Sequence, residues 1–285
     1  MEKRKELKIV KELTEINNDR RIVLNDTGLT SRVYIIDYGE YVFKFLKNKK
    51  YQEELEHEAN ILKLIKNYDF NVNIPLIKWV GEGKEYIGFK GMTGSSMTSD
   101  IINELSENQR KEVGKQIGVF LKTLHAIEYK GENPNNESSV IKWLLSSFCK
   151  RRRTLKKYFN ENELSFIEKL VTSLPEKSSK HGIEEVFCHG DLGYNNIIIS
   201  DQLQVGIIDF GDAGNLDKSY DFIGLEDDIM LDAAMQAYGG DGNLKEKVAI
   251  RRQLLPLMEM LFFIDRKDNV EIEKSAGKMR NNLKN

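Results

Sequence analysis

Apolar residues near the start of the chain recur at helical spacing, and the pattern then changes to the short runs that are typical of strands. Ile9, Leu13 and Ile16 share one helical face and predict an amphipathic helix. The β-branched and aromatic runs that follow are separated by turns containing Gly28 and Gly39. They predict three antiparallel strands, at residues 21–25, 32–37 and 41–46.

A second helix and two further strands complete this first region. Leu55, Ala59, Leu62 and Ile65 lie on one face of a predicted helix. Residues 76–80 and 85–89 are predicted strands on either side of a glycine-containing turn. Residues 1–90 are therefore expected to form a five-stranded sheet with one inserted helix.

The pattern from Ser106 onward is mainly helical. Ser106 and Gln109 form a capping-box signature at the start of one helix. A short β region interrupts the helices at residues 186–188, 197–199 and 205–208, and further helices are predicted at residues 139–158, 162–174 (ending at Pro175), 225–238 and 244–266. The chain is thus predicted to be an α+β protein with a small antiparallel sheet and a larger helical part.

Composition narrows the functional classes. The chain has 285 residues, and its 43 Lys and Arg against 45 Asp and Glu give a net charge of −2. A general nucleic-acid-binding protein would carry a basic surplus, so we expect no nucleic-acid partner, and the basic run at 150–157 is interpreted as a solvated helix face. The opening segment is charged, and the apolar run at 254–264 is short and contains Glu259. We therefore expect no signal peptide, no membrane span and a cytoplasmic location, and two cysteines fit a reducing compartment.

Candidate chemistry concentrates between residues 188 and 212. His189, Asp191 and Asn196 lie in a loop that leads into an apolar strand, and Asp209 follows the next apolar strand directly before Phe210-Gly211. A carboxylate can orient a hydroxyl and accept its proton, whereas an amide oxygen and a second carboxylate are hard ligands suited to Mg²⁺. This set is the one that phosphoryl transfer from a nucleotide requires. A hairpin with polar turn residues would account for one or two of these side chains but not for all of them.

The first region offers a matching cation. Alternation along residues 41–45 places Lys44 on the face opposite Phe43 and Phe45, and Glu58 lies on the inserted helix. A strand lysine held by a helix glutamate would grip the nucleotide phosphates. Glu54 is the competing partner, but Glu58 lies closer to the apolar face of its helix.

These residues, in this order, resemble the aminoglycoside phosphotransferases, which have a protein-kinase-like fold. The resemblance extends from Lys44 and Glu58 through the connecting segment 89–94 to residues 189–196 and 209–222, and Gly190 stands where eukaryotic protein kinases have Arg. The segment GFKGMTG and the acidic run at 225–228 are most similar to the enzymes that phosphorylate a 2″-hydroxyl. The resemblance implies a bilobal fold with a nucleotide-binding lobe at 1–90, a hinge at 91–98 and a helical lobe at 99–285.

The resemblance also implies roles by position. Asp191 would be the catalytic base, Asn196 and Asp209 would bind Mg²⁺, and Lys44 with Glu58 would hold the phosphates of ATP or GTP. Backbone groups near Lys90 and Met92 would meet the purine. Asp221 and His189 would brace the catalytic loop.

One departure from protein kinases is the phosphate loop. The segment NDTGLTSRVY contains a single glycine and no glycine-rich motif. Ser31 and the backbone amides of residues 27–31 are the expected phosphate contacts instead. Nothing in the sequence separates ATP from GTP.

A cationic acceptor needs carboxylates around its amines. Glu259 is informative because a carboxylate in an otherwise apolar helix costs stability unless it is paired or faces a cleft. A solvated stripe on that helix is the alternative, and a helix N-terminal preference competes for the acidic run near 226. The candidate acceptor-binding carboxylates are Asp212, Asp217, Glu226, Asp227, Asp228 and Glu259.

We therefore expect an aminoglycoside kinase that confers antibiotic resistance and acts as a monomer. A metabolic kinase of the same fold, acting on choline, a sugar or homoserine, is the alternative enzyme. A nucleotide-binding pseudokinase is the non-enzymatic alternative, and the intact set of Lys44, Asp191, Asn196 and Asp209 disfavours it.

Overall fold

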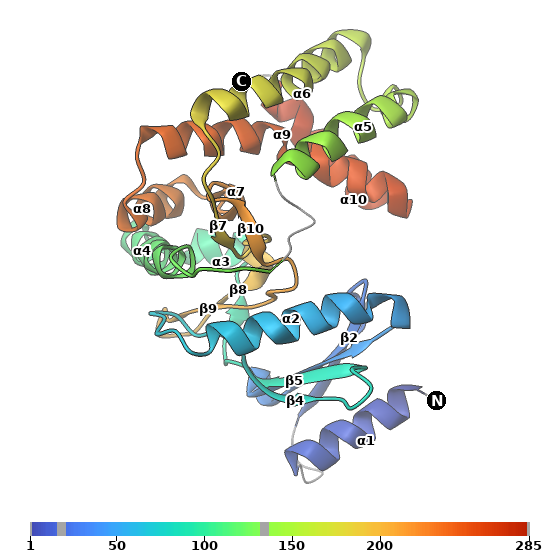
Figure 1. The fold of residues 1–285 in the computed structure, drawn as a ribbon, viewed down its shortest axis with the longest axis vertical. Helices are drawn as coiled ribbons and strands as arrows, with labels where there is room; N and C mark the ends of the chain where they lie inside the picture. The colour runs from blue at the N-terminus through green and yellow to red at the C-terminus, as the bar shows by residue number, and fades with distance from the viewer. Residues whose placement is uncertain (1, 16–20, 132–136, 284–285) are drawn as a thin grey trace.

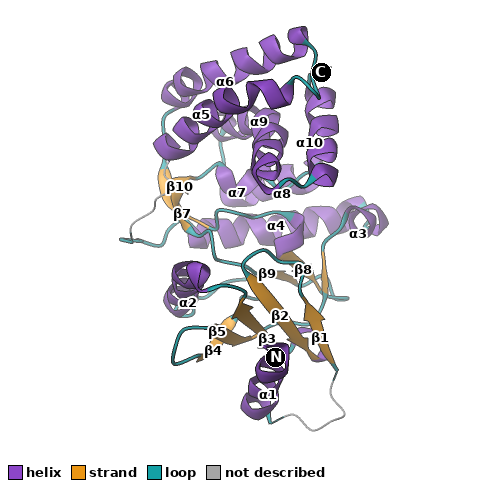
Figure 2. Ribbon diagram, turned by 90° about the vertical axis from the view of Figure 1, so that its right-hand side faces the viewer, coloured by secondary structure: helices purple, strands orange, loops and turns teal. Residues whose placement is uncertain are grey.

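The predicted strands of the first region form one antiparallel sheet with the strand order β1-β2-β3-β5-β4 (Figures 1 and 2). The structure is a computed structural model that describes residues 2–15, 21–131 and 137–283. Ile16, assigned to the first helical face, lies outside these residues. The elements of this lobe are α1 (Glu2–Thr14), β1 (Ile22–Asn25), β2 (Ser31–Ile36), η1 (Asp37–Gly39), β3 (Tyr41–Leu46), η2 (Lys49–Tyr51), α2 (Gln52–Ile65), β4 (Leu76–Val80) and β5 (Tyr86–Lys90).

Two helices cover opposite faces of this sheet (Figures 1 and 2). Val10 of α1 packs with Phe43 and Phe45 on the outer face. Leu55 and Leu62 of α2 pack with Ile87 and other residues on the inner face, toward the second lobe. Because side chains alternate along β3, Lys44 points to the inner side, as its sequence pattern predicts.

The second lobe is mainly helical. Its elements are β6 (Ser95–Ser96), α3 (Ser99–Glu104), α4 (Glu107–Leu124), α5 (Glu137–Leu155), α6 (Glu161–His181), β7 (Glu185–Cys188), η3 (Tyr194–Asn196), β8 (Ile197–Ile199), β9 (Val205–Ile207), β10 (Gly214–Asp217), α7 (Tyr220–Ile223), α8 (Asp228–Tyr238), α9 (Gly242–Arg266) and α10 (Asn269–Asn282). The bilobal α+β fold is therefore confirmed. In the described part of the chain, no helix is both long and apolar enough to cross a membrane.

Two small antiparallel sheets in the second lobe position the candidate chemistry. β7 pairs with β10, and β8 pairs with both β6 and β9. β6 and β10 were not predicted, because runs of two and four residues carry little periodicity. The loop from Cys188 to Ile197 and the loop after Ile207 consequently start from paired strands.

The prediction that Pro175 ends a helix is wrong. Helix α6 continues through Pro175 to His181. Proline removes one backbone hydrogen bond and crowds the preceding turn. Val171 and Leu174 are buried in the cluster formed by α5, α6, α9 and α10, and this tertiary packing favours continuation of the helix.

The acidic run near residue 226 belongs to a helix start that lies later than the sequence predicts. The expected helix at 225–238 begins at Asp228 because Asp227 is its N-cap and accepts a hydrogen bond from the Met230 N–H at 2.9 Å.

The basic run at 150–157 lies mainly at the surface, and Leu155 is its buried residue. Leu155 is fully buried. Arg152 pairs with Glu168 at 2.6 Å, and Lys156 pairs with Glu161 at 2.8 Å. These pairs fit the interpretation of a solvated helix face.

Close packing of α4 against α8 depends on glycine. A Cβ atom added at Gly118 would lie 2.1 Å from the carbonyl oxygen of Ala234, and one at Gly114 would lie 2.3 Å from that of Met230. The two glycines are one helical turn apart, so they form the strip along which α8 approaches α4. Any larger residue would separate the two helices.

We therefore expect alanine to have opposite effects at two helical glycines. Gly118→Ala should lower the free energy of unfolding by about 1–3 kcal/mol, because the added methyl overpacks the α4–α8 contact. Gly277→Ala in α10, where nothing lies within 4 Å of the added methyl, should raise it by about 0.5–1 kcal/mol. Urea denaturation measures both, and equal shifts in the same direction would contradict the packing described here.

Candidate active site

A hydrogen-bonded pair occupies the loop between β7 and β8. The side-chain amide of Asn196 donates to Asp191 Oδ2 at 2.9 Å and to the Asp191 carbonyl oxygen at 2.8 Å. Asn196 is 4% exposed. Both donated bonds use its nitrogen, so they orient the Asp191 carboxylate, and the Asn196 oxygen could coordinate a metal ion.

A buried carboxylate holds the start of this loop. Asp221 of α7 is fully buried and accepts hydrogen bonds from the backbone N–H groups of His189 at 2.8 Å and Gly190 at 2.9 Å. His125 Nε2 lies 3.0 Å from the same carboxylate. Burial alone would raise the pKa of Asp221, but the hydrogen bond and charge of His125 hold it below its ordinary value.

His189 is fully buried, and both of its ring nitrogens bond to backbone groups. Its Nε2 lies 3.0 Å from the carbonyl oxygen of Ile208, and its Nδ1 accepts the N–H of Asp191 at 3.3 Å. Burial lowers the pKa of His189, so its ring is neutral at pH 7 with the proton on Nε2. The histidine therefore links the two chemistry-bearing loops, which is the bracing position that the sequence resemblance implies for it.

The backbone at position 190 has no room for a side chain such as arginine. Its φ of +87° is strained for residues with a side chain, and a Cβ atom there would lie 2.3 Å from the carbonyl oxygen of Asp212. The two loops thus approach each other at a distance that only glycine allows.

Asp209 lies at the end of the β9 segment in a left-handed conformation, with a φ of +67°. Such conformations in a non-glycine residue are uncommon and cluster at functional sites. Burial would raise the pKa of Asp209, but the neighbouring Lys44 ammonium holds it below its ordinary value. Asp209 is therefore ionised at neutral pH.

Lys44 joins the two lobes through ion pairs. Its Nζ lies 2.6 Å from Glu58 Oε1 on α2 and 2.9 Å from Asp209 Oδ1 in the second lobe. Burial alone would lower the pKa of Lys44, but these two carboxylates raise it above its ordinary value. The structure thus brings Lys44 and Glu58 together, and Glu54 makes no ion pair with Lys44 within the described part of the chain.

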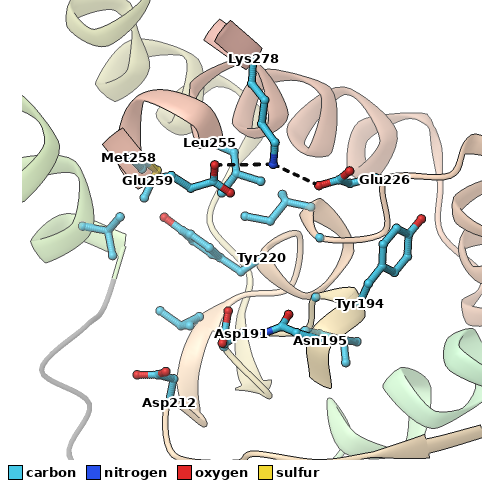
Figure 3. Close-up of a pocket in the computed structure, with 17 residues that line it drawn as sticks. Asp191, Tyr194, Asn195, Asp212, Tyr220, Glu226, Leu255, Met258, Glu259 and Lys278 are labelled. Atoms are coloured by element: carbon cyan, nitrogen blue, oxygen red, sulfur yellow. Dashed lines mark ion pairs between the residues drawn. The ribbon is translucent and has the colours of Figure 1, made fainter. Parts of the chain in front are cut away.

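Two cavities meet at Asp191. One, of about 350 Å³, is lined by residues of both lobes, including Ser31, Lys44, Glu58 and Asp209. The other, of about 500 Å³, lies wholly in the second lobe (Figure 3). Asp191 and Asp212 line both cavities. Burial, together with the negative charges of Asp212 and Asp209, raises the pKa of Asp191 to about 6.

The larger cavity is lined by four carboxylates and by a set of apolar side chains. Glu226 and Glu259 face Lys278 across its upper part, and Asp191 and Asp212 lie at the opposite end (Figure 3). Its apolar lining includes Val140, Leu216, Tyr220, Ile223, Leu255 and Met258. Glu259 is therefore both paired and facing a cavity, and burial raises its pKa.

Three of the candidate acceptor carboxylates do not line this cavity. Asp227 caps α8 and pairs with Arg110 at 2.9 Å. Asp217 is fully buried and pairs with Lys247. Asp228 is 88% exposed and pairs with Arg252 at 3.2 Å. Because none of the three is in the lining of this cavity, the geometry gives no support to their assignment to the acceptor, which stays a prediction.

The predicted purine contacts also lie outside the lining of the smaller cavity as the structure describes it. Lys90 ends β5, and Met92 follows in the connection to the second lobe, where its backbone carbonyl approaches Gly39. The assignment of their backbone groups to the purine stays a prediction.

Two residues near the site were not found by sequence reasoning. His125 follows a helix end and could have been singled out only by its partner Asp221, 96 residues away. Lys278 lies on α10, a helix that was not predicted although Ile272, Ala276 and Met279 are spaced at helical intervals. That spacing was the available signal.

Several solved structures have the same fold as this chain. An aminoglycoside 2′-phosphotransferase-IIIa in complex with GDP has the same fold, with a TM-score of 0.84, 19% identity and 99% and 98% of the two chains covered. A complex of an APH(2″) enzyme with GDP and kanamycin has a TM-score of 0.79 and 20% sequence identity, with 96% of each chain covered. The macrolide 2′-phosphotransferase MphH from Brachybacterium faecium has a TM-score of 0.72 and 16% sequence identity, with 95% of this chain and 97% of that chain covered.

At these identities the likeness establishes the protein-kinase-like fold. The sequence itself goes further, because residues 21–251 match the profile of the phosphotransferase enzyme family, APH. The matched residues include Lys44, Glu58, Asp191, Asn196 and Asp209, whereas the parts of α9 and α10 that line the cavities lie beyond the match. The chain therefore belongs to the APH phosphotransferase enzyme family.

Proposed function

We propose that the protein transfers the γ-phosphate of ATP or GTP to a hydroxyl group of an aminoglycoside antibiotic, with the 2″-hydroxyl as the preferred acceptor. The observation that supports this proposal best is the position of Asp191, which lines both cavities. A nucleotide in the smaller cavity and an acceptor in the larger one would meet at this carboxylate. The carboxylates that line the larger cavity suit a cationic acceptor.

The donor would lie between the lobes. Lys44 would contact the phosphates of the donor, and the ion pair with Glu58 would hold the lysine in place. Ser31 lines the same cavity and is 7% exposed, so it and the neighbouring backbone amides are the proposed phosphate contacts. Residues 91–98 would form the hinge, with backbone groups near Lys90 and Met92 meeting the purine.

Asn196 and Asp209 are the proposed ligands for Mg²⁺. Mg²⁺ prefers oxygen ligands, and Asp209 and Asn196 supply a carboxylate oxygen and an amide oxygen. When bound, the ion would neutralise charge on the nucleotide phosphates. The bonds from the Asn196 nitrogen to Asp191 would keep its oxygen turned toward such an ion.

Asp191 would act directly on the acceptor. Its carboxylate would accept a hydrogen bond from the hydroxyl and align the oxygen with the γ-phosphorus. A bond then forms between that oxygen and phosphorus, the bond from phosphorus to the β–γ bridging oxygen breaks, and the hydroxyl proton passes to Asp191. The products are the phosphorylated acceptor and a nucleoside diphosphate.

Phosphorylation of an aminoglycoside would remove its antibiotic action, so we propose a resistance role for a monomeric enzyme in the cytoplasm, where nucleoside triphosphates are present. The kanamycin complex of a similarly folded protein supports the acceptor class. Steady-state assays of nucleoside diphosphate release, with separate aminoglycosides, choline and sugars as acceptors, test the proposal directly.

A macrolide is the second candidate acceptor. Apolar lining residues such as Leu216, Tyr220 and Met258 could pack against the apolar ring of a macrolide, which carries few charges. The similar fold of a macrolide 2′-phosphotransferase supports including macrolides in the same assay.

For Lys44→Met, we expect kcat/KM for the nucleotide to fall by about 10²-fold, since a positioned cation on the phosphates is lost. The free energy of unfolding should also fall by about 3 kcal/mol, because Glu58 is left buried without a partner. The double variant Lys44→Met with Glu58→Gln should recover most of the stability and none of the activity. Recovery of activity in the double variant would show that Lys44 acts only through folding.

For Asp191→Asn, we expect kcat to fall on the order of 10²–10⁴, because the amide cannot accept the hydroxyl proton. Nucleotide binding should change little. Asp209→Asn is the matched comparison and should instead remove magnesium-dependent nucleotide binding. Single-turnover transfer and nucleotide Kd separate the two effects, and near-normal transfer by Asp191→Asn would reject the mechanism.

For Glu226→Gln and Glu259→Gln, we expect the KM for an aminoglycoside to rise by about 3- to 10-fold in low salt, with a smaller rise in high salt. Asp228→Asn, which removes an exposed carboxylate outside the cavity, is the control and should leave KM unchanged. An equal effect of all three variants would indicate general surface attraction of the acceptor in place of a defined acidic wall.

A further inference from the structure

Lys278 places a cation of the chain itself inside the proposed acceptor cavity. Its side chain reaches down from α10, and its Nζ lies between the two upper carboxylates (Figure 3). The distances are 3.5 Å to Glu226 Oε1 and 3.7 Å to Glu259 Oε2. An ammonium group therefore already stands where the carboxylates would bind an amine of the acceptor.

The three residues come from separate parts of the second lobe. Glu226 precedes α8, Glu259 lies on α9, and Lys278 lies on α10. Helix α10 is fixed against its neighbours by the buried side chains of Ile272, Ala276 and Met279. The backbone of Lys278 is thus held firmly beside the cavity, and four side-chain bonds remain free to rotate.

The pairs made by Lys278 are weak enough to exchange. Both distances are longer than a normal N–H···O hydrogen bond, in which the two heavy atoms are roughly 2.7–3.2 Å apart. The Lys278 side chain is 51% exposed, and the Glu226 side chain is 58% exposed. Exposed ion pairs of this kind contribute little to stability, so a competing ammonium group can replace the lysine.

Glu259 gains most from a nearby cation. Its side chain is 31% exposed and lies among apolar residues of α9, with Ser275 Oγ 3.5 Å from its carboxylate. A half-buried carboxylate is costly without a counter-charge, whether the charge comes from the chain or from a ligand. The other carboxyl groups that line the cavity belong to Asp191 and Asp212, and its phenol groups belong to Tyr194 and Tyr220.

We propose that Lys278 is a tethered counter-ion and a specificity-determining residue: it occupies the site of one acceptor ammonium group and leaves the Glu226–Glu259 pair when a polyamine acceptor binds. This inference rests on the proposed use of the cavity as the acceptor site. Neutral acceptors gain nothing by displacing the lysine, because the carboxylates would lose a cation. Polyamine acceptors replace one cation by another and are thereby selected.

The direct test is acceptor binding to Lys278→Met, measured by titration calorimetry with kanamycin in the absence of nucleotide. Removal of the competing cation should tighten Kd by about 3- to 10-fold, the range expected for one or two partly exposed ion pairs. Lys274→Met is the matched control, because Lys274 lies one turn away on α10 and pairs with Glu271 at 2.5 Å. Its Kd should stay within about twofold of the unmodified protein. Lys278→Arg should restore the weaker binding.

A double-mutant cycle separates competition from a structural effect. If Lys278 competes for Glu259, the gain from Lys278→Met should largely vanish in the Glu259→Gln background. A gain of the same size in both backgrounds would overturn the proposal. So would a Kd for Lys278→Met that equals or exceeds that of Lys274→Met.

The same measurements distinguish this inference from the proposed function. Tighter kanamycin binding by Lys278→Met without any aminoglycoside phosphorylation would support the tethered counter-ion and reject the proposed reaction. Phosphorylation of kanamycin by a protein whose Kd does not respond to Lys278→Met would do the reverse. Failure of both Lys278→Met and the unmodified protein to bind kanamycin would reject both.

Discussion

The buried Asp221 carboxylate is the constraint on which the rest of the site depends. It accepts the backbone N–H groups of His189 and Gly190 and pairs with His125 of the segment after α4. These bonds set the direction of the loop that carries Asp191. A buried charge is stable only when it is fully hydrogen-bonded, so the chain must keep all three partners in place. The neutral His189 ring then extends the same network to the strand before Asp209.

Much of the architecture could be predicted from local pattern. The periodicity around Leu62 and the alternation along β3 identify α2 and the inward position of Lys44, because burial of one face dictates both. The capping box at Ser106 is present as predicted. Short ladders such as β6 and β10 could not be predicted, since their pairing is decided by distant strands. Pro175 shows tertiary packing overriding a local helix-ending signal.

The candidate site likewise has residues that local sequence predicts and residues that only distant contacts decide. Residues near one another in sequence, such as Asp191 and Asn196, could be assigned together because a short loop fixes their separation. Carboxylates that share only a charge could not be sorted: Glu259 lines the cavity, whereas Asp217 and Asp227 are taken up by Lys247 and Arg110. Which carboxylate lines the cavity depends on contacts between helices far apart in the chain. Composition and spacing carry no record of those contacts.

The shared wall between the two cavities constrains the order of events in a catalytic cycle. Asp191 and Asp212 belong to both compartments, so the two substrates would be separated by no more than these side chains. Direct transfer between two substrates that meet at Asp191 needs no intermediate in which the phosphoryl group is bound to the protein. The kinetics would be sequential, with both substrates bound before either product leaves, and the configuration at phosphorus would invert once.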